Sequence, residues 1–210
     1  MVDKLFIAGG VLHLLLIGGC QTSPVVRYSD GLAPPHTIAV LPVRNATPSL
    51  FVEGQFRDLM QSNLRDKGYD ALGHQQIDRK LANQLGISVG DQIGDGLIPS
   101  IGKTLEVDAV VVIVIAKYQP ASRSGMDVTV AIYDGVTGSK RWQHHVPGPR
   151  YDFYMEQLQR KDAVADMNRP KGTPRPPPFW ATPVHAARAE LFCAIPTGPG
   201  PQTKVPSYSC

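Results

Sequence analysis

Between residues 37 and 72 the spacing of hydrophobic residues changes from a continuous run to a helical period and back. Residues 37–43 (TIAVLPV) are a short apolar run, which predicts a first strand with Pro42 at its end. A helix is expected next, because apolar side chains recur at helical spacing: Phe56, Leu59, Met60 and Leu64. Gly68 suits the end of this helix, and residues 69–72 predict a brief second strand.

The following segment predicts two helices and the centre of a sheet. Apolar residues four apart predict an amphipathic helix over residues 75–85: Ile77, Leu81 and Leu85. A glycine-rich loop over residues 86–96 and a short helix over residues 99–105 follow. Residues 108–115 (DAVVVIVI) do not alternate, which is typical of a strand buried on both faces at the centre of a sheet.

Residues 126–146 predict a β-hairpin. Residues 126–133 alternate between two faces, residues 134–138 (DGVTG) supply turn chemistry, and residues 139–146 return as the partner strand. The sequence therefore predicts an α/β (α+β) domain over residues 36–146. We expect a mixed sheet of about four to five strands, in two or three layers with packed helices, and with the hairpin at one side.

Residues 147–210 are expected to be a helical and Pro-rich extension that packs on this domain. Residues 151–165 and 186–192 predict helices, whereas residues 168–178 (NRPKGTPRPPP) predict an extended strap. Phe179 and Trp180 follow the strap and are candidate partner contacts, because aromatic anchors beside extended prolines suit a groove. The preferred interpretation is that the strap covers its own domain.

The first 20 residues have the pattern of a lipoprotein signal. Residues 5–17 are an apolar run of 13 residues after Lys4, shorter than the roughly 20 that span a bilayer and typical of a secretory signal peptide. Ile17-Gly-Gly-Cys20 resembles the lipobox of bacterial lipoproteins. We expect cleavage after residue 19 and attachment of lipid, palmitate-type acyl chains, to Cys20, which would hold the protein stably on a membrane. An ordinary signal peptide is the alternative.

The residues after Cys20 indicate where the protein goes. Gln21 in place of Asp favours the outer membrane, by resemblance to the enterobacterial sorting rule, with the domain facing the periplasm. Residues 20–35 are polar and contain three prolines, so they predict a flexible tether. Residues 22–35 would extend some 45 Å at about 3.3 Å per residue.

The cysteine count agrees with export. Once Cys20 carries lipid, Cys193 and Cys210 remain, an even number in a compartment that permits disulfides. A disulfide between them would close a loop of about 15 residues, worth roughly 3 kcal/mol in the chain-entropy model. Two unpaired thiols are the alternative.

Sequence signals that resemble catalytic or metal sites are incomplete. Gly102-Lys-Thr104 matches only the end of a Walker A loop, and Ser124 lacks the flanking pattern of a nucleophile elbow. His144 and His145 are neighbours on a strand and point to opposite faces, so they do not readily bind one metal ion. We expect no metal, no cofactor and no enzymatic activity; a hydrolase with an unrecognised site is the least favoured hypothesis.

Composition and charge exclude two further classes of protein, namely disordered chains and nucleic-acid-binding proteins. Apolar residues make up 42% of the 210 residues, enough for a hydrophobic core, so global disorder is not expected. The net charge is +3, and removing residues 1–19 leaves it unchanged because Lys4 and Asp3 leave together. Lys and Arg do not cluster on one element with stacking aromatics, so no nucleic-acid partner is expected.

Several of these stretches together resemble an uncharacterised family of Gram-negative lipoproteins typified by a meningococcal vaccine-candidate antigen. They are the lipobox at Cys20, residues 38–42 (IAVLP) with Asn45, residues 108–111 (DAVV), residues 133–138 (YDGVTG) with Trp142, and residues 186–191 with residues 196–199 (PTGP). The end of the chain differs, since it reads Gly-Pro-Gly-Pro where the family has a basic residue and a histidine after Gly-Pro.

The resemblance implies a domain similar to the amino-terminal domain of TolB and to periplasmic parts of the curli secretion lipoprotein CsgG. It implies protein–protein interaction in the envelope and no catalytic residues. The leading hypothesis is an outer-membrane-anchored periplasmic interaction module, an accessory subunit of an envelope or secretion assembly. Its partners would be other envelope proteins, including other lipoproteins. A regulator of a cell-wall synthase is the alternative.

Overall fold

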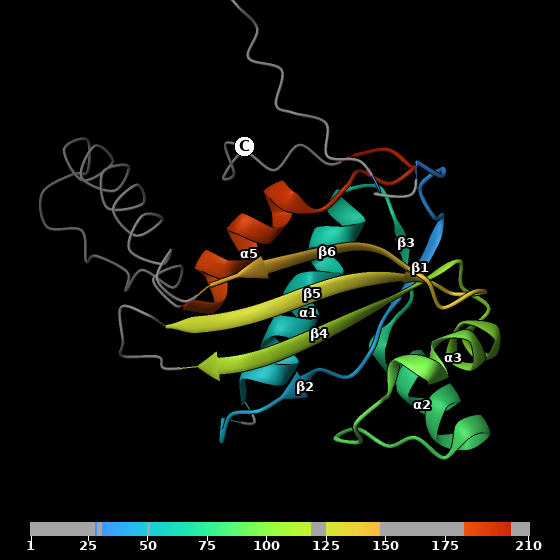
Figure 1. The fold of residues 1–210 in the computed structure, drawn as a ribbon, viewed down its shortest axis with the longest axis horizontal. Coiled ribbons are helices and arrows are strands. Elements are labelled where there is room, and N and C mark those ends of the chain that lie inside the picture. The colour runs from blue at the N-terminus through green and yellow to red at the C-terminus, as the bar shows by residue number, and fades with distance from the viewer. Residues whose placement is uncertain (1–27, 29–30, 50, 119–124, 148–182, 203–210) are drawn as a thin grey trace, which may run out of the picture.

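A mixed β-sheet with helices on both faces forms the body of the protein (Figure 1). The computed structural model describes Tyr28 and residues 31–49, 51–118, 125–147 and 183–202. Within these residues the predicted α/β domain, a mixed sheet with packed helices, is confirmed.

The sheet has six strands, in the order β3-β1-β4-β5-β6, with β2 also paired to β4. Their bounds are β1 Thr37–Val40, β2 Arg44–Asn45, β3 Asp70–Ala71, β4 Ala109–Tyr118, β5 Met126–Asp134 and β6 Lys140–Val146. Strands β1, β2 and β3 run parallel to their neighbours, whereas β4, β5 and β6 pair antiparallel. The unbroken apolar run thus forms the central strand β4, and the predicted hairpin forms one side of the sheet.

The strand expected over residues 37–43 is too long, because β1 ends at Val40 before Pro42, and a separate strand β2 begins at Arg44. Proline has no N–H to donate to a neighbouring strand. Both pieces still pair with β4, since Val40 lies opposite Val111 and Arg44 lies opposite Val114. The chain is therefore paired with β4 both before and after Pro42.

The helices fall close to the predicted segments. Their bounds are α1 Phe51–Asp66, α2 His74–Leu85, the 3-10 turn η1 Asp95–Leu97, α3 Ile98–Leu105 and α5 Pro183–Ala194. Gly68, the residue expected to end the first helix, has a φ of +88°, a conformation that glycine adopts without strain. Helix α5 extends several residues beyond its prediction at the amino-terminal end.

Helices α1 and α5 pack on one face of the sheet, called here the α1/α5 face. Its buried residues come from alternate positions of the long strands and from one stripe of each helix: Ile38, Val40, Val111, Ile113, Ile115, Val128, Val130, Ile132, Trp142, Val52, Phe56, Met60, Leu64, Val184, Ala187 and Leu191. This is the larger of the two hydrophobic cores.

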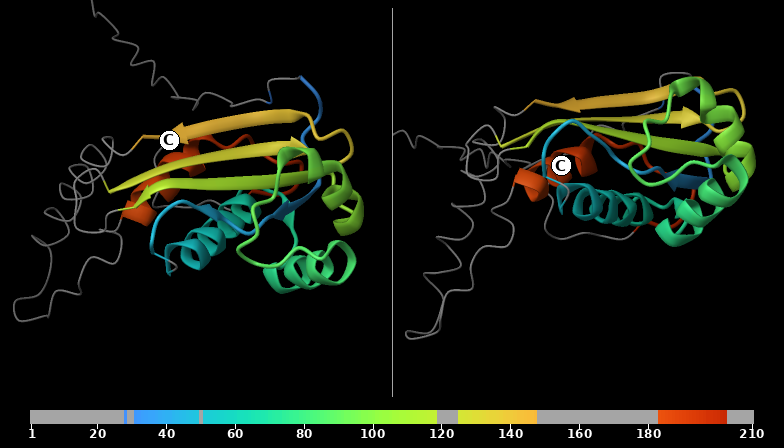
Figure 2. Two further views of the ribbon diagram at one scale, coloured as in Figure 1. Left: turned by 60° about the horizontal axis from the view of Figure 1, so that its bottom comes forward. Right: turned by 90° about the horizontal axis from the view of Figure 1, so that it is seen from below.

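Helices α2 and α3 pack on the opposite face, called here the α2/α3 face. They cover the end of the sheet at which β1 and β4 begin, the entry end (Figure 2). The buried residues of this smaller core are Ala39, Leu41, Ile77, Leu81, Ile93, Ile98, Ile101, Leu105, Val107, Val110, Val112, Ala131 and Tyr133. Toward the far end, where β4 ends and β5 begins, no helix in the described ranges lies over this face.

Contacts with the domain begin earlier in the chain than residue 36. Tyr28, within the segment expected to be a flexible tether, is 6% exposed and belongs to the α1/α5 core. The chain from residue 31 to β1 runs along the entry end of the sheet, where the segment after α5 also arrives (Figure 1). A tether free of the domain therefore ends before Tyr28.

Several predictions lie outside the described residues. These are the signal peptide and Cys20, the strap over residues 168–178 with Phe179 and Trp180, the helix over residues 151–165, and Cys210. None of the helices in the described part of the chain is long and apolar enough to cross a membrane.

Candidate interaction surface

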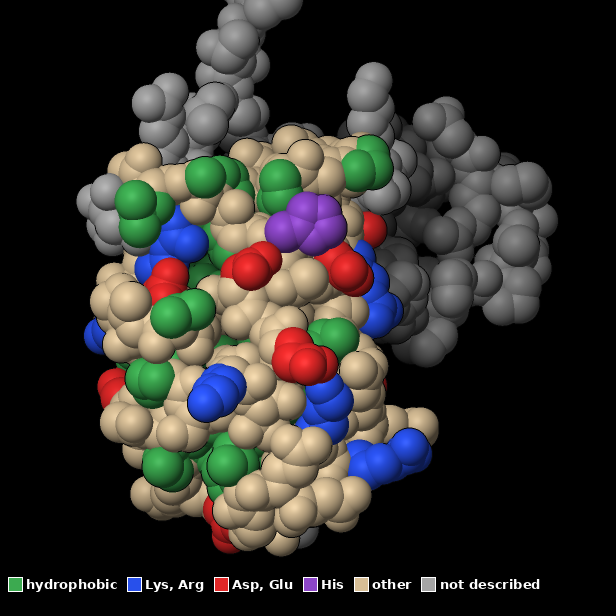
Figure 3. Space-filling view, turned by 90° about the vertical axis from the view of Figure 1, so that its right-hand side faces the viewer, with side chains coloured by type: hydrophobic (Ala, Val, Ile, Leu, Met, Phe, Trp, Pro, Cys, Tyr) green, Lys and Arg blue, Asp and Glu red, His purple; other side chains and the backbone are tan. Residues whose placement is uncertain are grey.

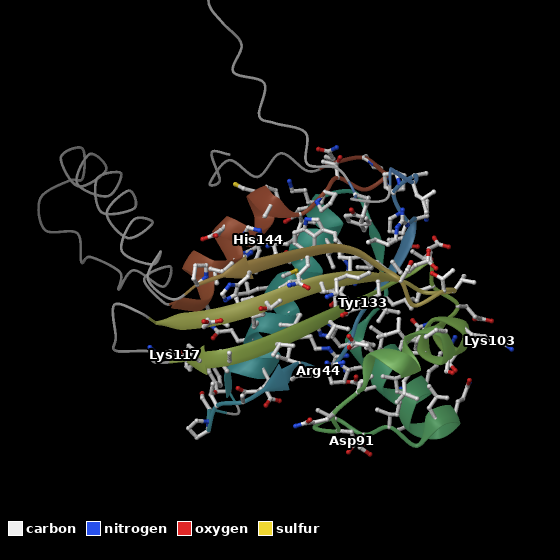
Figure 4. All side chains as sticks on the ribbon, in the orientation of Figure 1. Arg44, Asp91, Lys103, Lys117, Tyr133 and His144 are labelled. Carbon is white, nitrogen blue, oxygen red and sulfur yellow. The ribbon has the colours of Figure 1, made fainter. Side chains whose placement is uncertain are left out.

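One area of the α2/α3 face is left accessible by the helices that the structure describes. Across the strands it forms a row in register, because Arg44 lies opposite Val114, Val114 opposite Thr129, and Thr129 opposite His145. We call this row, together with the adjoining residues Lys117, Asp127 and Gln143, the open sheet face. Arg44 and Lys117, two of its residues, are labelled in Figure 4.

Strand alternation explains why these residues point away from the α1/α5 core. Along β5, Val128 and Val130 are buried against α1 and α5, so the residues between them face the other way. On that side Tyr133 and Ala131 are buried under the small core, whereas Thr129 and Asp127 are partly exposed. The part of this sheet face that the smaller core buries therefore ends between Ala131 and Thr129.

The centre of the open sheet face carries two short side chains. Val114 and Thr129 are β-branched and half-buried, and Gln143 beside them is exposed. Such a surface offers apolar contact area together with hydroxyl and amide groups that form hydrogen bonds. It suits contact with another macromolecule better than enclosure of a small ligand.

A polar cluster borders the open sheet face where η1 lies over the sheet. Arg44 Nη2 donates to Asp95 Oδ1 at 3.1 Å, and the Tyr133 hydroxyl donates to Asp95 Oδ2 at 3.0 Å. Burial and the hydrogen bond to Asp95 raise the pKa of Tyr133. Both oxygens of one carboxylate are thus engaged, so the cluster fixes the position of Arg44 at the border.

A second polar pair lies at the far end. His145 Nε2 lies 2.8 Å from Asp127 Oδ1, and Lys117 lies opposite Asp127 in the sheet. With Arg44 and Asp95, the open sheet face therefore has acidic and basic groups at both of its ends.

The two histidines point to opposite faces, as the sequence predicts. His144 Nε2 contacts Glu190 Oε1 of α5 at 3.2 Å, and the ring of His144 stacks on Trp142. His145 pairs instead with Asp127 on the open sheet face. Among the described residues, no group of three or more His, Cys, Asp or Glu is arranged to hold a metal ion.

An open pocket of about 460 Å³ lies at the entry end of the molecule, between α3 and the turn after β5. Its carboxylates already have structural partners: Glu106 accepts from Lys80 Nζ at 3.1 Å, and Asp108 accepts from the backbone N–H groups of His36 and Thr37, each at 2.9 Å. These hydrogen bonds lower the pKa of Asp108. Figure 3 faces this end and shows acidic, basic and hydrophobic side chains interspersed.

The Gly102-Lys-Thr104 stretch lies inside helix α3. A Cβ atom at Gly102 would overlap the backbone of Gly135, so this glycine allows the helix to approach the β5–β6 turn. The interpretation as a packed short helix is confirmed, and the stretch is not a phosphate-binding loop.

Turn residues that carry the sequence resemblance have structural roles. Asp134 Oδ1 accepts from the backbone N–H groups of Val136 and Thr137, at 3.0 and 2.8 Å. Asn45 Nδ2 donates to Glu53 of α1 at 3.0 Å. These residues shape turns and join elements.

The Gly-Pro-Gly-Pro end also has a structural role. Gly198 N donates to the carbonyl of Lys67 at 2.8 Å, and Gly200 N donates to the carbonyl of Gly68 at 2.9 Å. A Cβ atom at Gly68 would overlap the carbonyl group of Gly200. The glycines therefore allow the tail to lie directly against the backbone that follows α1.

The predicted site residues and the open sheet face do not coincide. Cys20, Phe179, Trp180 and Cys210 lie outside the described residues, and Cys193 lies near the end of α5. The pairing of Cys193 with Cys210 stays a prediction. The polar alternate positions of residues 127–129 and 143–145 were the sequence signal for the open sheet face. Arg44 carried no such signal because its strand is two residues long.

Comparisons with known proteins found similarity to solved structures. Neither a scan of protein-family models nor a search of curated proteins found a match. Lipoprotein GNA1162 from Neisseria meningitidis is similar at 14% identity and a TM-score of 0.47, over 62% of this chain and 99% of that one. LpoB from Escherichia coli is similar at 15% identity and a TM-score of 0.47, over 70% of this chain and 81% of that one.

TolB from Acinetobacter baumannii is also similar, at 17% identity and a TM-score of 0.34, over 68% of this chain and 30% of that one. The similar structures thus include a meningococcal lipoprotein and TolB, as the sequence resemblance implies. Each TM-score lies below 0.5, so the proposals below rest on this chain's own residues.

Proposed function

We propose that this protein is a lipid-anchored interaction module of the bacterial envelope, an accessory subunit that binds a protein partner through its open sheet face. The observation that carries the proposal is the unequal cover of the sheet. The α1/α5 face is buried along the full length of β5, whereas the α2/α3 face becomes accessible at Thr129 and Asp127.

The composition of the open sheet face favours a protein partner. Its centre combines small apolar side chains with hydrogen-bonding groups, and its ends hold charged groups of both signs. Protein interfaces have an apolar centre and a polar rim, and complementary charges add specificity and speed of association.

Binding is proposed in place of catalysis. A catalytic site needs a nucleophile or a general base within hydrogen-bond reach of its partner group. The residues that line the pocket at the entry end include neither His nor Cys, and its carboxylates Glu106 and Asp108 are engaged in structural hydrogen bonds.

The anchor is proposed from the amino-terminal sequence pattern. We propose lipid on Cys20, an outer-membrane location and a domain in the periplasm. Intact-mass spectrometry of the membrane-extracted protein tests the anchor. A chain that starts at Cys20 and carries acyl chains is expected, and a Cys20→Ala variant should lack them.

Site-specific photo-crosslinking tests the open sheet face. A crosslinking amino acid at Gln143, introduced into the full-length protein in its own envelope, is expected to capture a defined protein partner. The same amino acid at Gln84, an exposed residue of α2, is the matched control and should not capture it. Thr129→Arg places a long charged side chain in the centre of the face and should abolish capture at Gln143.

Two outcomes would count against this surface. Capture of the same proteins from both positions would indicate random collisions, and no capture from Gln143 would indicate that the face is not used. A cell-wall synthase as the captured partner would select the regulator hypothesis. Thermal unfolding of the Thr129→Arg variant checks that its fold is unchanged.

A further inference from the structure

Tyr28 is held in the domain by contacts from three separate parts of the chain. We call these residues, Tyr28, Tyr69, Arg141 and Pro196, the Tyr28 cluster. The hydroxyl groups of Tyr28 and Tyr69 lie 2.6 Å apart, and the Tyr69 hydroxyl lies 2.9 Å from the carbonyl oxygen of Pro196. The guanidinium of Arg141 lies 4.6 Å from the centre of the Tyr28 ring.

The hydrogen bonds of the cluster have one consistent direction. A hydroxyl has a single proton to donate. Tyr69 gives its proton to the Pro196 carbonyl, so Tyr28 must donate to the Tyr69 oxygen. Burial, with the neighbouring Tyr28, raises the pKa of Tyr69, so the Tyr69 hydroxyl stays protonated. Both hydroxyl protons are therefore donated in hydrogen bonds, and Tyr69 links Tyr28 to Pro196 in the segment after α5.

The chain between Tyr28 and β1 is attached as well. Gly31 N donates to the Tyr28 carbonyl at 3.3 Å, and Gly31 has a φ of +68°, which glycine adopts without strain. Arg141 Nη2 donates to the carbonyl of Ala33 at 2.7 Å. Arg141 thus contacts both Tyr28 and the segment after it, and fixes this segment at the entry end.

These contacts set the distance between the domain and the proposed anchor. Tyr28 follows Cys20 by eight positions, and a fully extended chain over that separation spans at most about 29 Å. If the chain were free up to Thr37, 17 residues would span up to about 60 Å. The Tyr28 cluster therefore halves the reach of the domain.

We propose that the Tyr28 cluster shortens the tether and so limits the height above the bilayer at which the open sheet face meets its protein partner. This inference rests on the proposed function, because it uses the lipid anchor at Cys20. Tyr28 lies at the entry end, whereas the open sheet face lies toward the far end of β5, whose nine residues span about 30 Å. The tether and this strand length together therefore limit how far from the bilayer the open sheet face can reach.

The test changes tether length in two independent ways in the lipidated full-length protein. Tyr28→Ala removes the ring and hydroxyl that attach the segment. A 9-residue Gly/Ser insertion after Gln21 lengthens the tether without touching the cluster, and about doubles its length. Phe51→Ala, at an exposed aromatic residue (77% exposed), is the matched control.

Two readouts are taken for each variant. Energy transfer from a fluorescent amino acid at Gln143 to acceptor-labelled lipid in vesicles of phosphatidylethanolamine and phosphatidylglycerol reports height above the membrane. Crosslinking yield from Gln143 in the envelope reports partner contact. Doubling the tether length should lower the yield about threefold, because effective concentration falls roughly as the −3/2 power of length. Both lengthened variants should also show weaker energy transfer, and Phe51→Ala should match the parent.

The outcomes separate this inference from the proposed function. Partner capture from Gln143 in the parent, reduced in both lengthened variants, supports the inference. Capture that is unchanged in both variants would overturn it while leaving the interaction module intact. Unchanged energy transfer in Tyr28→Ala would also overturn it, because the cluster would then not set the height. No capture in the parent would contradict the proposed function itself.

Discussion

The two faces of the sheet differ in how far their cover extends. On the α1/α5 face, every inward-pointing residue of β5 from Met126 to Ile132 is buried. On the α2/α3 face, burial includes Tyr133 and Ala131 and decreases at Thr129 and Asp127. The same strand is thus core on one side along its whole length and accessible on the other side over half of it.

This difference separates residues that maintain the fold from residues available for binding. Burial of apolar area is the main source of stability, so substitutions on the α1/α5 face should unfold the protein. Substitutions on the open sheet face should leave stability nearly unchanged, which makes them clean tests of function. Neighbouring residues of one strand provide matched pairs for this comparison.

The largest contrast is expected between Trp142 and Gln143, adjacent residues of β6 that point to opposite faces. Trp142→Ala removes a ring that is 8% exposed in the main core and should lower the free energy of unfolding by about 3–5 kcal/mol. Gln143→Ala should change it by about 0.5 kcal/mol or less. Urea unfolding measures both, and similar losses would contradict the assignment of the two faces.

The next effect is expected where the carboxy-terminal tail lies against the end of α1. Gly68→Ala forces a side chain into a left-handed conformation and against Gly200, and should cost about 2–4 kcal/mol. Gly86→Ala is the control, since Gly86 ends α2 with a φ of +66° and open space around it. It should cost about 1–2 kcal/mol. Equal costs in thermal or urea unfolding would show that the tail contact is unimportant.

A smaller effect is expected at Asp108, which directly precedes β4. Its carboxylate accepts from the backbone N–H groups of His36 and Thr37 at the start of β1. Its pKa is lowered by hydrogen bonds from Thr37 and His36, so its contribution is present above the unfolded-state pKa of about 4. This contribution is lost as the pH falls through the lower folded-state pKa. Asp108→Asn should cost about 1 kcal/mol at neutral pH and flatten the stability profile below about pH 4. A variant as acid-sensitive as the parent would argue against this role.

The smallest effect is expected for the pair of His145 and Asp127 on the open sheet face. Their side chains are 50% and 32% exposed, and exposed ion pairs contribute about 0.2–1 kcal/mol. His145→Gln should therefore lower stability by less than about 1 kcal/mol in urea unfolding. A larger loss would show that this end of the face belongs to the core.

Local patterns predicted most of the elements but not their partners. The unbroken run of residues 108–115 predicted the central strand because a strand between two helix layers needs apolar residues on both sides. The alternation of residues 126–133 predicted a strand with one buried face, and its polar positions did mark part of the open sheet face. Pro42 was placed at the end of one strand, whereas it separates two.

The open sheet face could not be predicted from spacing alone, because it depends on where the cover ends. Helix α3 is eight residues long, and only its position over Tyr133 and Ala131 leaves Thr129 accessible. Arg44 joins the surface through pairing with β4, which is 70 residues away in the chain. Pairing of this kind depends on contacts between distant segments.

The sequence by itself determined the periodic elements, the turn at residues 134–138 and the lipobox pattern. Each of these follows from residues that are neighbours in the chain. Only the tertiary structure decided that Tyr28 belongs to the core and that one half of one sheet face stays accessible. Both depend on residues far apart in the sequence, since Tyr28 meets Tyr69 and Arg141 only when the sheet and its helices are assembled.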